Sequence, residues 1–161
     1  MTLPLGYALR PATVADAALI QHQRDAMFTD MGQDPARLAQ VHEVGAAWLR
    51  GALGRGLYTG VLAQAGAEVI AGAGMLWQDL PPNEDTALTV RAYVLNVYVR
   101  PDHRGQKLAR LLVEHLLAEC AARGVRLVSL HASDAGRPIY EALGFTPTNE
   151  LRLTLPGEGR A

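Results

Sequence analysis

The sequence predicts a single α/β domain in which one mixed sheet is flanked by helices. Its length of 161 residues is enough for one substantial core but too short for two ordinary domains. Two stretches with helical apolar spacing come early, and stretches that read as antiparallel strands follow them. The rest of the chain alternates strand, helix, strand, helix and strand, which favours helices packed on a sheet.

The N-terminal third predicts a short strand and two helices. The strand covers residues 7–10. Thr13 can then cap a helix whose positive N-terminus is complemented by Asp16, and this helix should end near Gly32. The second helix begins at Pro35, because proline suits the first helical turn, and it ends in a glycine-rich stretch.

The next segment predicts a β-hairpin. Its strands cover residues 57–65 and 69–77, and residues 66–68 join them. Gly72 and Gly74 interrupt the second strand, which indicates either a bulge or the close approach of another group to the backbone. A surface loop over residues 79–86 follows.

The stretch after that loop predicts a strand, a basic loop and a long amphipathic helix. The strand covers residues 93–99, the loop residues 100–107, and the helix begins at Leu108 and ends at residues 123–124. This arrangement can bind an anion, because the amides of the first helical turn have no intrahelical acceptor. From the residues alone, a solvated basic loop in front of a helix is the simpler interpretation.

The C-terminal part predicts a strand over residues 126–131, a helix over residues 138–143 and a final strand over residues 150–155. We therefore expect one domain over residues 1–156 and a flexible tail over residues 157–161.

Composition narrows the class of protein. Hydrophobic residues make up 49% and charged residues 19%, which is typical of a globular protein. The net charge of −1 gives no global field that would recruit nucleic acid or an anionic membrane. The single cysteine, Cys120, lies on the apolar face of a helix and predicts a buried, inert thiol. With neither a signal peptide nor a long apolar run, a cytoplasmic protein is expected.

Two motifs carry a resemblance to the GNAT superfamily of N-acetyltransferases. Residues 97–109 resemble its motif A, in which a strand ending in V-x-P is followed by [QR]-x-x-G-x-[GA] at the start of a helix. Residues 139–145, IYEALGF, are similar to its Y-E-x-L-G-F signature. Residues 9–13, together with Asp16, resemble its usual N-terminus, and the resemblance is strongest over residues 95–145.

The resemblance implies a mostly antiparallel sheet with one splayed parallel strand pair, and a site for acetyl-CoA. Backbone groups of Val97, Tyr98 and Val99 would pair with the pantetheine arm as an added strand does. The resemblance also implies that a further set of residues binds the cofactor, mainly through backbone amides that hold the pyrophosphate. They are Arg104, Gly105, Gln106, Lys107, Leu108, Ala109, Arg110 and Ser133.

Lys107 departs from the motif, and Ser133 has two interpretations. Lys107 stands where the motif has its first glycine, and we expect it to adopt an ordinary negative helical φ that still offers its N–H. Ser133 lies where relatives often have an asparagine that contacts the pantetheine arm or the amine. It could equally be a cap or turn residue before the last helix.

Tyr140 matches the tyrosine that protonates the departing CoA thiolate in the family. A phenol, with a pKa near 10, holds its proton at neutral pH and can donate it. A tyrosine packed between helix and sheet is the alternative.

No carboxylate occurs over residues 87–99, where many relatives place a general base. Other candidates for the base lie outside that strand: Glu43, Asp79, Asp85, His103 and His131. The five histidines show no metal-ligand spacing, so no metal is expected.

The sequence thus predicts an acetyl-CoA-dependent N-acetyltransferase that acts on a primary amine of a small molecule or peptide. Transfer would be direct, in a ternary complex, because no nucleophile is well placed for an acyl-enzyme. Residues 24–56 and 79–86 should line the amine side. The alternative is a non-catalytic acyl-CoA-binding regulatory domain; a nucleic-acid-binding module is disfavoured. The sequence leaves a monomer and a homodimer both open.

Overall fold

A five-stranded mixed sheet forms the centre of the molecule. The computed structural model describes residues 3–84 and 86–155. The strand order is β1-β2-β3-β4-β5, with antiparallel pairing from β1 to β4 and parallel pairing between β4 and β5. The strands are β1 (Tyr7–Pro11), β2 (Tyr58–Ala65), β3 (Glu68–Asp79), β4 (Val90–Val99) and β5 (Val128–Leu130). The predicted mixed sheet is confirmed.

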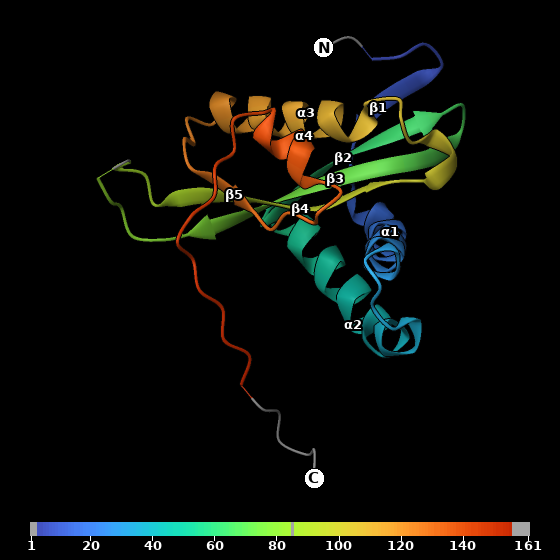
Figure 1. Cartoon of the computed structure of the whole chain (residues 1–161), viewed down its shortest axis with the longest axis horizontal. Helices are drawn as coiled ribbons and strands as arrows, with labels where there is room; N and C mark the ends of the chain where they lie inside the picture. Colours follow the sequence, from blue (N-terminus) through green and yellow to red (C-terminus); the bar gives the residue numbers. More distant parts are fainter. Residues whose placement is uncertain (1–2, 85, 156–161) are drawn as a thin grey trace.

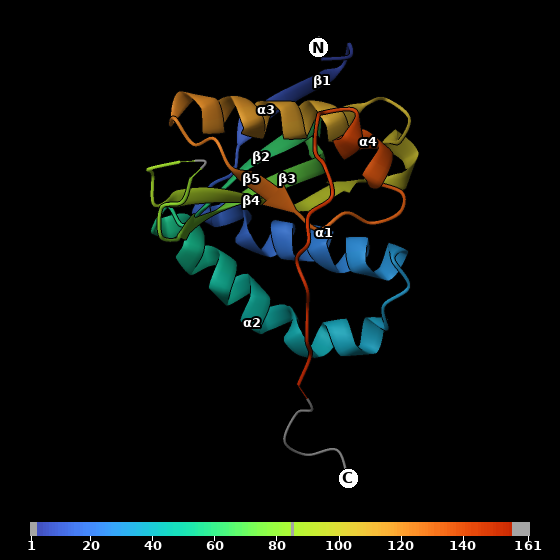
Figure 2. The ribbon, with the colours of Figure 1, turned by 60° about the vertical axis from the view of Figure 1, so that its left-hand side comes forward.

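Helices cover both faces of this sheet. The α-helices are α1 (Ala17–Asp30), α2 (Pro35–Gly54), α3 (Leu108–Ala122) and α4 (Arg137–Glu141). Helix α3 lies on one face with α4 beside it, and α1 and α2 lie on the other (Figures 1 and 2). Two short 3-10 helices, η1 (Val14–Asp16) and η2 (Pro101–His103), precede α1 and α3. Among the residues that the structure describes, no helix is both long and apolar enough to cross a membrane.

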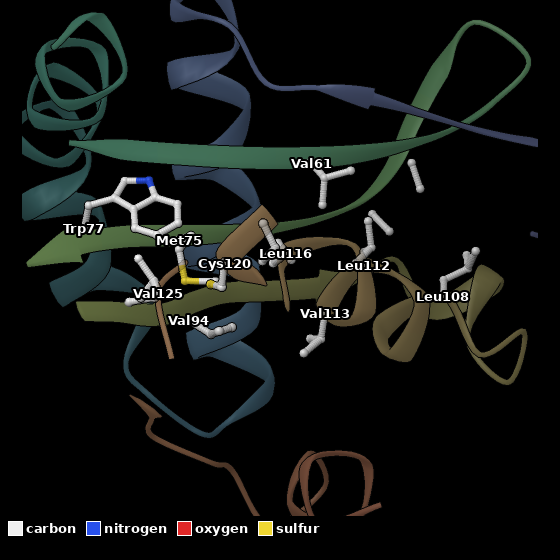
Figure 3. Packing of buried hydrophobic residues seen from close by; sticks show 14 of the residues in the cluster. Val61, Met75, Trp77, Val94, Leu108, Leu112, Val113, Leu116, Cys120 and Val125 are labelled. Carbon is white, nitrogen blue, oxygen red and sulfur yellow. The ribbon is translucent and has the colours of Figure 1, made fainter. Parts of the chain in front are cut away.

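The main core lies between α3 and the sheet. Leu112, Leu116 and Cys120 recur every four residues, so they form one stripe along α3. This stripe packs over Val61 of β2 and Met75 of β3, and all five side chains are buried (Figure 3). Because α3 is fixed in this way along its length, its N-terminus is held in a defined place beside the sheet.

Gly72 and Gly74 show that both sequence interpretations of β3 are correct. The register between β3 and β4 shifts between these two glycines, which is a bulge. The hydroxyl of the buried Tyr58 also approaches Gly74 closely: a Cβ built there would lie 1.8 Å from Tyr58 Oη. A side chain at Gly74 would therefore overlap a ring that has no room to move.

We expect Gly74→Ala to lower the free energy of unfolding by about 2–3 kcal/mol, because the added methyl overpacks the site against Tyr58. Urea unfolding measures this effect. Gly54→Ala is the matched control, since a Cβ at Gly54 meets only Val14 Cγ2 at 3.9 Å. Equal stability of the two variants would contradict the account of Gly74.

The prediction of a final strand over residues 150–155 is wrong, because these residues form no strand in the structure. The segment is extended but forms no strand, and it runs away from the sheet past the layer of α1 and α2 (Figures 1 and 2). Leu151, Leu153 and Leu155 are 95%, 82% and 74% exposed. The alternating pattern identifies the side chains of a strand, whereas pairing also requires a neighbouring edge. The predicted tail over residues 157–161 lies outside the described residues.

Candidate functional site

An opening between β4 and β5 gives the site its shape. The two strands pair only at Ala92–Val94 of β4, and β5 then ends at Leu130. The strand predicted over residues 126–131 is therefore shorter than expected, because β5 diverges from β4. Beyond Val94, β4 keeps β3 as its neighbour, and none of the residues that the structure describes pairs with it as a strand on the β5 side.

Backbone groups of β4 are directed into this opening. The N–H of Arg100 donates to Ile70 O of β3 at 2.9 Å. Alternate residues of a strand direct their backbone groups to opposite edges, so Val97 and Val99 point away from β3. The Val99 carbonyl indeed accepts a hydrogen bond from Arg104 Nε at 3.0 Å rather than from a strand. The edge formed by Val97–Val99 can therefore accept an extended ligand.

Asn96 marks the bend in β4 and belongs to a buried polar cluster that sequence reasoning missed. It has a φ of +56°, in the left-handed region that asparagine tolerates better than most residues. Its Oδ1 accepts from Arg24 Nη1 of α1, and its Nδ2 donates to Tyr58 Oη at 3.3 Å. The available signal was one asparagine in an otherwise apolar strand.

The loop from β4 to α3 presents unpaired backbone donors. Gly105 has a φ of +80°, which turns the chain toward the helix. Leu111 N is the first amide bonded back into the helix, to Lys107 O at 3.1 Å. Within the described residues, no acceptor bonds the N–H groups of residues 105–110. Together with the positive end of the α3 dipole, they form an anion-binding cradle.

The expectation for Lys107 is wrong. Lys107 precedes the helix as its N-cap and has φ +60° and ψ +16°, in the left-handed region. The loop has to reverse direction between η2 and α3, and this conformation achieves the reversal. A residue with a Cβ is destabilised there by about 1–2 kcal/mol, which explains why the motif has glycine at this position.

Lys107→Gly should raise the free energy of unfolding by about 0.5–1 kcal/mol, because relief of the left-handed strain exceeds the greater flexibility of glycine in the unfolded chain. Chemical denaturation measures the change. Lys107→Ala is the control, since it removes the ammonium but keeps the Cβ. A gain of the same size for Lys107→Ala would mean that charge, and not backbone conformation, is responsible.

The basic side chains near the cradle are largely engaged within the protein. Arg100 pairs with Glu68 and Asp102, and Arg104 pairs with Asp30. Arg110 Nε lies 2.9 Å from Glu114 Oε1. Lys107 forms no ion pair or side-chain hydrogen bond among the described residues, so the free donors of this loop are its ammonium and the backbone amides.

Tyr140 lies on α4 and is half-buried. Its ring packs edge-on against Phe145, with centroids 6.0 Å apart, and burial raises the pKa of its phenol. No hydrogen bond holds its hydroxyl among the described residues. A Cβ at Gly136 would lie 2.9 Å from Tyr140 Cε2, so the glycine makes room for the ring. Tyr140 is therefore a protonated phenol whose hydroxyl is available to a ligand.

Ser133 stabilises the turn before α4. Its Oγ accepts a hydrogen bond from Gly136 N at 3.1 Å, and its carbonyl accepts one from Arg137 N at 2.9 Å. The turn interpretation of this residue agrees with these contacts. They fix the start of α4 and hence the position of Tyr140.

His131 is the candidate base that the fold places at the opening. It directly follows Leu130, whose pairing with Val94 is the last between β4 and β5. Its Nδ1 contacts the hydroxyl of Tyr93 on β4. The imidazole is exposed and can therefore exchange protons with solvent or with an acceptor.

The other candidate bases lie elsewhere or are engaged. His103 is bonded to Tyr7 Oη at 2.8 Å, beside the anion cradle. Asp79 pairs with Val90 at the far end of β4. Val90 lies five residues, or about 17 Å along the strand, from Leu95, where the opening begins. Glu43 is exposed on α2, and Asp85 lies outside the described residues.

Cys120 is buried, and burial raises the pKa of its thiol to about 11. It points into the core between α3 and the sheet (Figure 3), which agrees with an inert thiol. No cluster of three or more potential metal ligands occurs among the described residues.

Comparison with known proteins places this geometry in a family. Residues 56–147 match the model of the acetyltransferase (GNAT) domain. A GCN5-related N-acetyltransferase from Ralstonia eutropha JMP134 is 34% identical, has a TM-score of 0.90, and matches over 94% of this chain and 100% of its own. A predicted acetyltransferase from Clostridium acetobutylicum, solved with acetyl-CoA, is 27% identical with a TM-score of 0.86, over 92% and 96% of the two chains.

A curated relative matches over a shorter stretch. The [ribosomal protein bS18]-alanine N-acetyltransferase of Escherichia coli K12 is 40% identical over 68 residues. That stretch is 40% of this chain and 46% of the relative, so the chain spans about half the length of the relative it matches. The domain match, the R. eutropha structure and the splayed β4–β5 pair agree, and the chain belongs to the GNAT acetyltransferase family.

Proposed function

We propose that the protein transfers the acetyl group of acetyl-CoA to a primary amine. The observation that carries this proposal is the continuity of two ligand-binding features. The open edge of Val97–Val99 leads along the chain to the unpaired amides of residues 105–110. An extended arm ending in a pyrophosphate matches both features, and acetyl-CoA has this shape.

In this complex, Val97 and Val99 hydrogen-bond the pantetheine arm through their backbone, as an added strand does, while Tyr98 lies between them. The amides of residues 105–110 bind the pyrophosphate. Arg104 orders the loop through its bonds to Val99 and Asp30. Ser133 holds the turn before α4 by accepting from Gly136 N, and its own O–H stays able to donate a hydrogen bond to the arm.

The chemistry needs one proton donor and one proton acceptor. The amine nitrogen attacks the thioester carbonyl, a C–N bond forms, and the C–S bond breaks. Tyr140 donates its phenolic proton to the departing thiolate, and His131 accepts a proton from the amine, directly or through water. Transfer is direct, because the buried Cys120 thiol holds its proton and cannot form an acyl-enzyme.

The acceptor is an amine of a peptide or a small molecule. Helix α1 faces the bend in β4, since Arg24 bonds Asn96, which supports the expectation that the segment beginning at Arg24 lines the amine side. The E. coli relative acts on an alanine of a ribosomal protein. Peptide N-termini therefore belong in the first panel of substrates.

The test is release of free CoA thiol from acetyl-CoA in the presence of peptide N-termini, amino acids, polyamines and aminoglycosides. We expect turnover with at least one class, and a product whose mass is increased by one acetyl group. Tight binding of acetyl-CoA with no turnover on any amine would instead favour a regulatory acyl-CoA-binding domain.

His131→Gln should lower kcat/KM for the amine by about 100-fold near neutral pH, because general-base catalysis contributes roughly that much. The loss should shrink as the pH approaches the pKa of the amine itself, since the free amine then needs no base. Steady-state kinetics between pH 6.5 and about 10 measure both effects. A deficit that does not change with pH would assign His131 a structural role. His115→Gln, on α3, is the matched control.

A further inference from the structure

We propose that Arg24 of α1 binds a carboxylate of the acceptor, so that the substrates are amino acids or similar amines with a carboxylate close to the amine nitrogen. Since it names the acceptor of the proposed transferase, this assignment rests on the proposed function. The guanidinium lies at the bend of β4, carries a charge that no carboxylate of the described residues balances, and has N–H groups that a ligand can reach.

Arg24 is fixed at the bend of β4 by contacts with two different side chains. Helix α1 lies against β4 (Figures 1 and 2). Ile20, one turn before Arg24, is buried in the core, so this face of the helix is turned toward the sheet. Arg24 Nη1 donates to Asn96 Oδ1, and Arg24 Cζ lies 4.6 Å from the centroid of the Phe28 ring. The hydrogen bond and the cation–π contact together hold the guanidinium in one place.

The charge of Arg24 has no carboxylate partner among the described residues. Asp25, the next residue, is engaged elsewhere: it accepts from Gln21 Nε2 at 2.7 Å and contacts His42 Nδ1. Burial is the largest influence on the guanidinium and lowers the pKa of Arg24. A desolvated charge that is bonded only to a neutral amide is destabilising, so its presence indicates a binding role rather than a structural one.

The guanidinium retains donors for a ligand. Of its five N–H groups, Asn96 accepts one. Arg24 is half-buried, and within the described residues Arg91 Nε is the one side-chain nitrogen or oxygen that is both buried and unpartnered. Nε and Nη2 of Arg24, which bond no described residue, are therefore reached by solvent. These two nitrogens present a planar fork that matches the two oxygens of a carboxylate.

The position of Arg24 suits an acceptor bound beside the thioester. Its partner Asn96 directly precedes Val97, the first residue of the edge proposed to hold the pantetheine arm. Burial raises the pKa of Tyr93, and the nearby charge of Arg24 opposes this effect. Tyr93 in turn contacts His131, the proposed base. A carboxylate on Arg24 therefore places an amine a few bonds away between the reactive end of the arm and His131.

The charges around this position favour an anionic acceptor. Besides Arg24, the charged side chains that act on Tyr93 are those of Glu150 and Arg152. Two of these three side chains are cationic and one is anionic, so the local potential is positive and attracts a carboxylate. The same potential repels polyamines and aminoglycosides, whose additional ammonium groups would lie near Arg24.

The first experiment compares kcat/KM for free amino acids and β-alanine with kcat/KM for their amides, corrected for the fraction of unprotonated amine. The amide keeps the amine and the shape but removes the charge. We expect the wild type to favour at least one carboxylate over its amide by about 10- to 100-fold, mainly through KM, because hydrogen bonds to a charged group contribute that much. Polyamines should be poor acceptors. Amides used as well as their carboxylates throughout the panel would overturn the assignment.

Arg24→Met should abolish this preference, and Arg24→Lys should keep part of it. The ratio of carboxylate to amide is the quantity compared, because loss of the bond to Asn96 affects both acceptors alike. Tyr58→Phe is the matched control: it removes the other hydrogen bond of Asn96 but leaves Arg24 in place, so the ratio should not change. Arg152→Met should also preserve it. A ratio that persists in Arg24→Met, or that is lost in either control, would overturn the assignment.

Binding of the products tests the assignment without turnover. N-acetyl amino acids and their amides are titrated calorimetrically into the protein saturated with CoA. We expect the carboxylates to bind at least about tenfold more tightly than the amides, and Arg24→Met to remove the difference.

These results separate the assignment of Arg24 from the proposed function. Preferential binding of carboxylates with no transfer to any amine would contradict the proposed function and support the role of Arg24. Transfer to amines without a preference for carboxylates would support the proposed function and overturn the role of Arg24. Equal binding of carboxylates and amides overturns that role whether or not transfer occurs.

Discussion

Tyr140→Phe should lower kcat by about 100-fold while leaving the affinity for acetyl-CoA within about threefold of the wild type. The phenol is the proposed donor to the CoA thiolate, and general-acid catalysis contributes 10²–10⁴-fold. Burial raises the pKa of Tyr140, so the donor stays protonated at the pH of the assay. Transient and steady-state thiol release give kcat, and calorimetry gives the dissociation constant.

The loss should be specific to chemistry. The Tyr140 hydroxyl has no hydrogen-bond partner among the described residues, so its removal should change Tm by no more than about 2 °C. Because the pKa is raised, wild-type activity should not fall on the alkaline side until the pH exceeds the ordinary phenol value near 10. Full activity of the phenylalanine variant would remove Tyr140 from the mechanism.

Gln106→Glu should weaken acetyl-CoA binding at least about tenfold without destabilising the free protein. Gln106 is exposed in the loop before α3, among the unpaired amides. A carboxylate there repels the pyrophosphate, but it also interacts favourably with the positive end of the helix, by about 0.3–1 kcal/mol. Ligand affinity and the stability of the free protein should therefore change in opposite directions.

The control for this variant is Gln33→Glu, which adds the same charge at an exposed position after α1. Its affinity for acetyl-CoA should equal that of the wild type. The deficit of Gln106→Glu should also shrink as salt is raised, because the repulsion is screened. An unchanged dissociation constant for Gln106→Glu would place the pyrophosphate elsewhere.

The strand, loop and helix around residues 93–122 were predictable because their signals are local. A run of β-branched, aromatic and aliphatic residues identifies β4, the four-residue stripe identifies α3, and the first helical turn leaves its amides free whatever the side chains are. The conformation of Lys107 was not predictable in this way. Its positive φ results from the position of η2 relative to α3, which the packing of α3 on the sheet determines.

Asn96 and His131 depend on contacts between distant parts of the chain. Asn96 is bonded to Arg24, 72 residues away, and His131 contacts Tyr93, 38 residues away. No periodicity in the sequence encodes such pairs, so the sequence does not distinguish His131 from the other four candidate bases. In the fold, His131 differs from them because it lies where β4 and β5 separate. The segment over residues 150–155 has the same limitation, since its pattern defines a strand but not the strand that it pairs with.

Binding of acetyl-CoA is the most direct test of the central claim, and thermal unfolding with increasing acetyl-CoA measures it. A ligand that binds only the folded state stabilises it by about 2.7 kcal/mol at 100 times its Kd, which corresponds to a rise in Tm of about 5–10 °C for a domain of this size. We expect this rise for the wild type and for Gln33→Glu, and a much smaller rise for Gln106→Glu. A Tm of the wild type that does not change at millimolar acetyl-CoA would contradict the account.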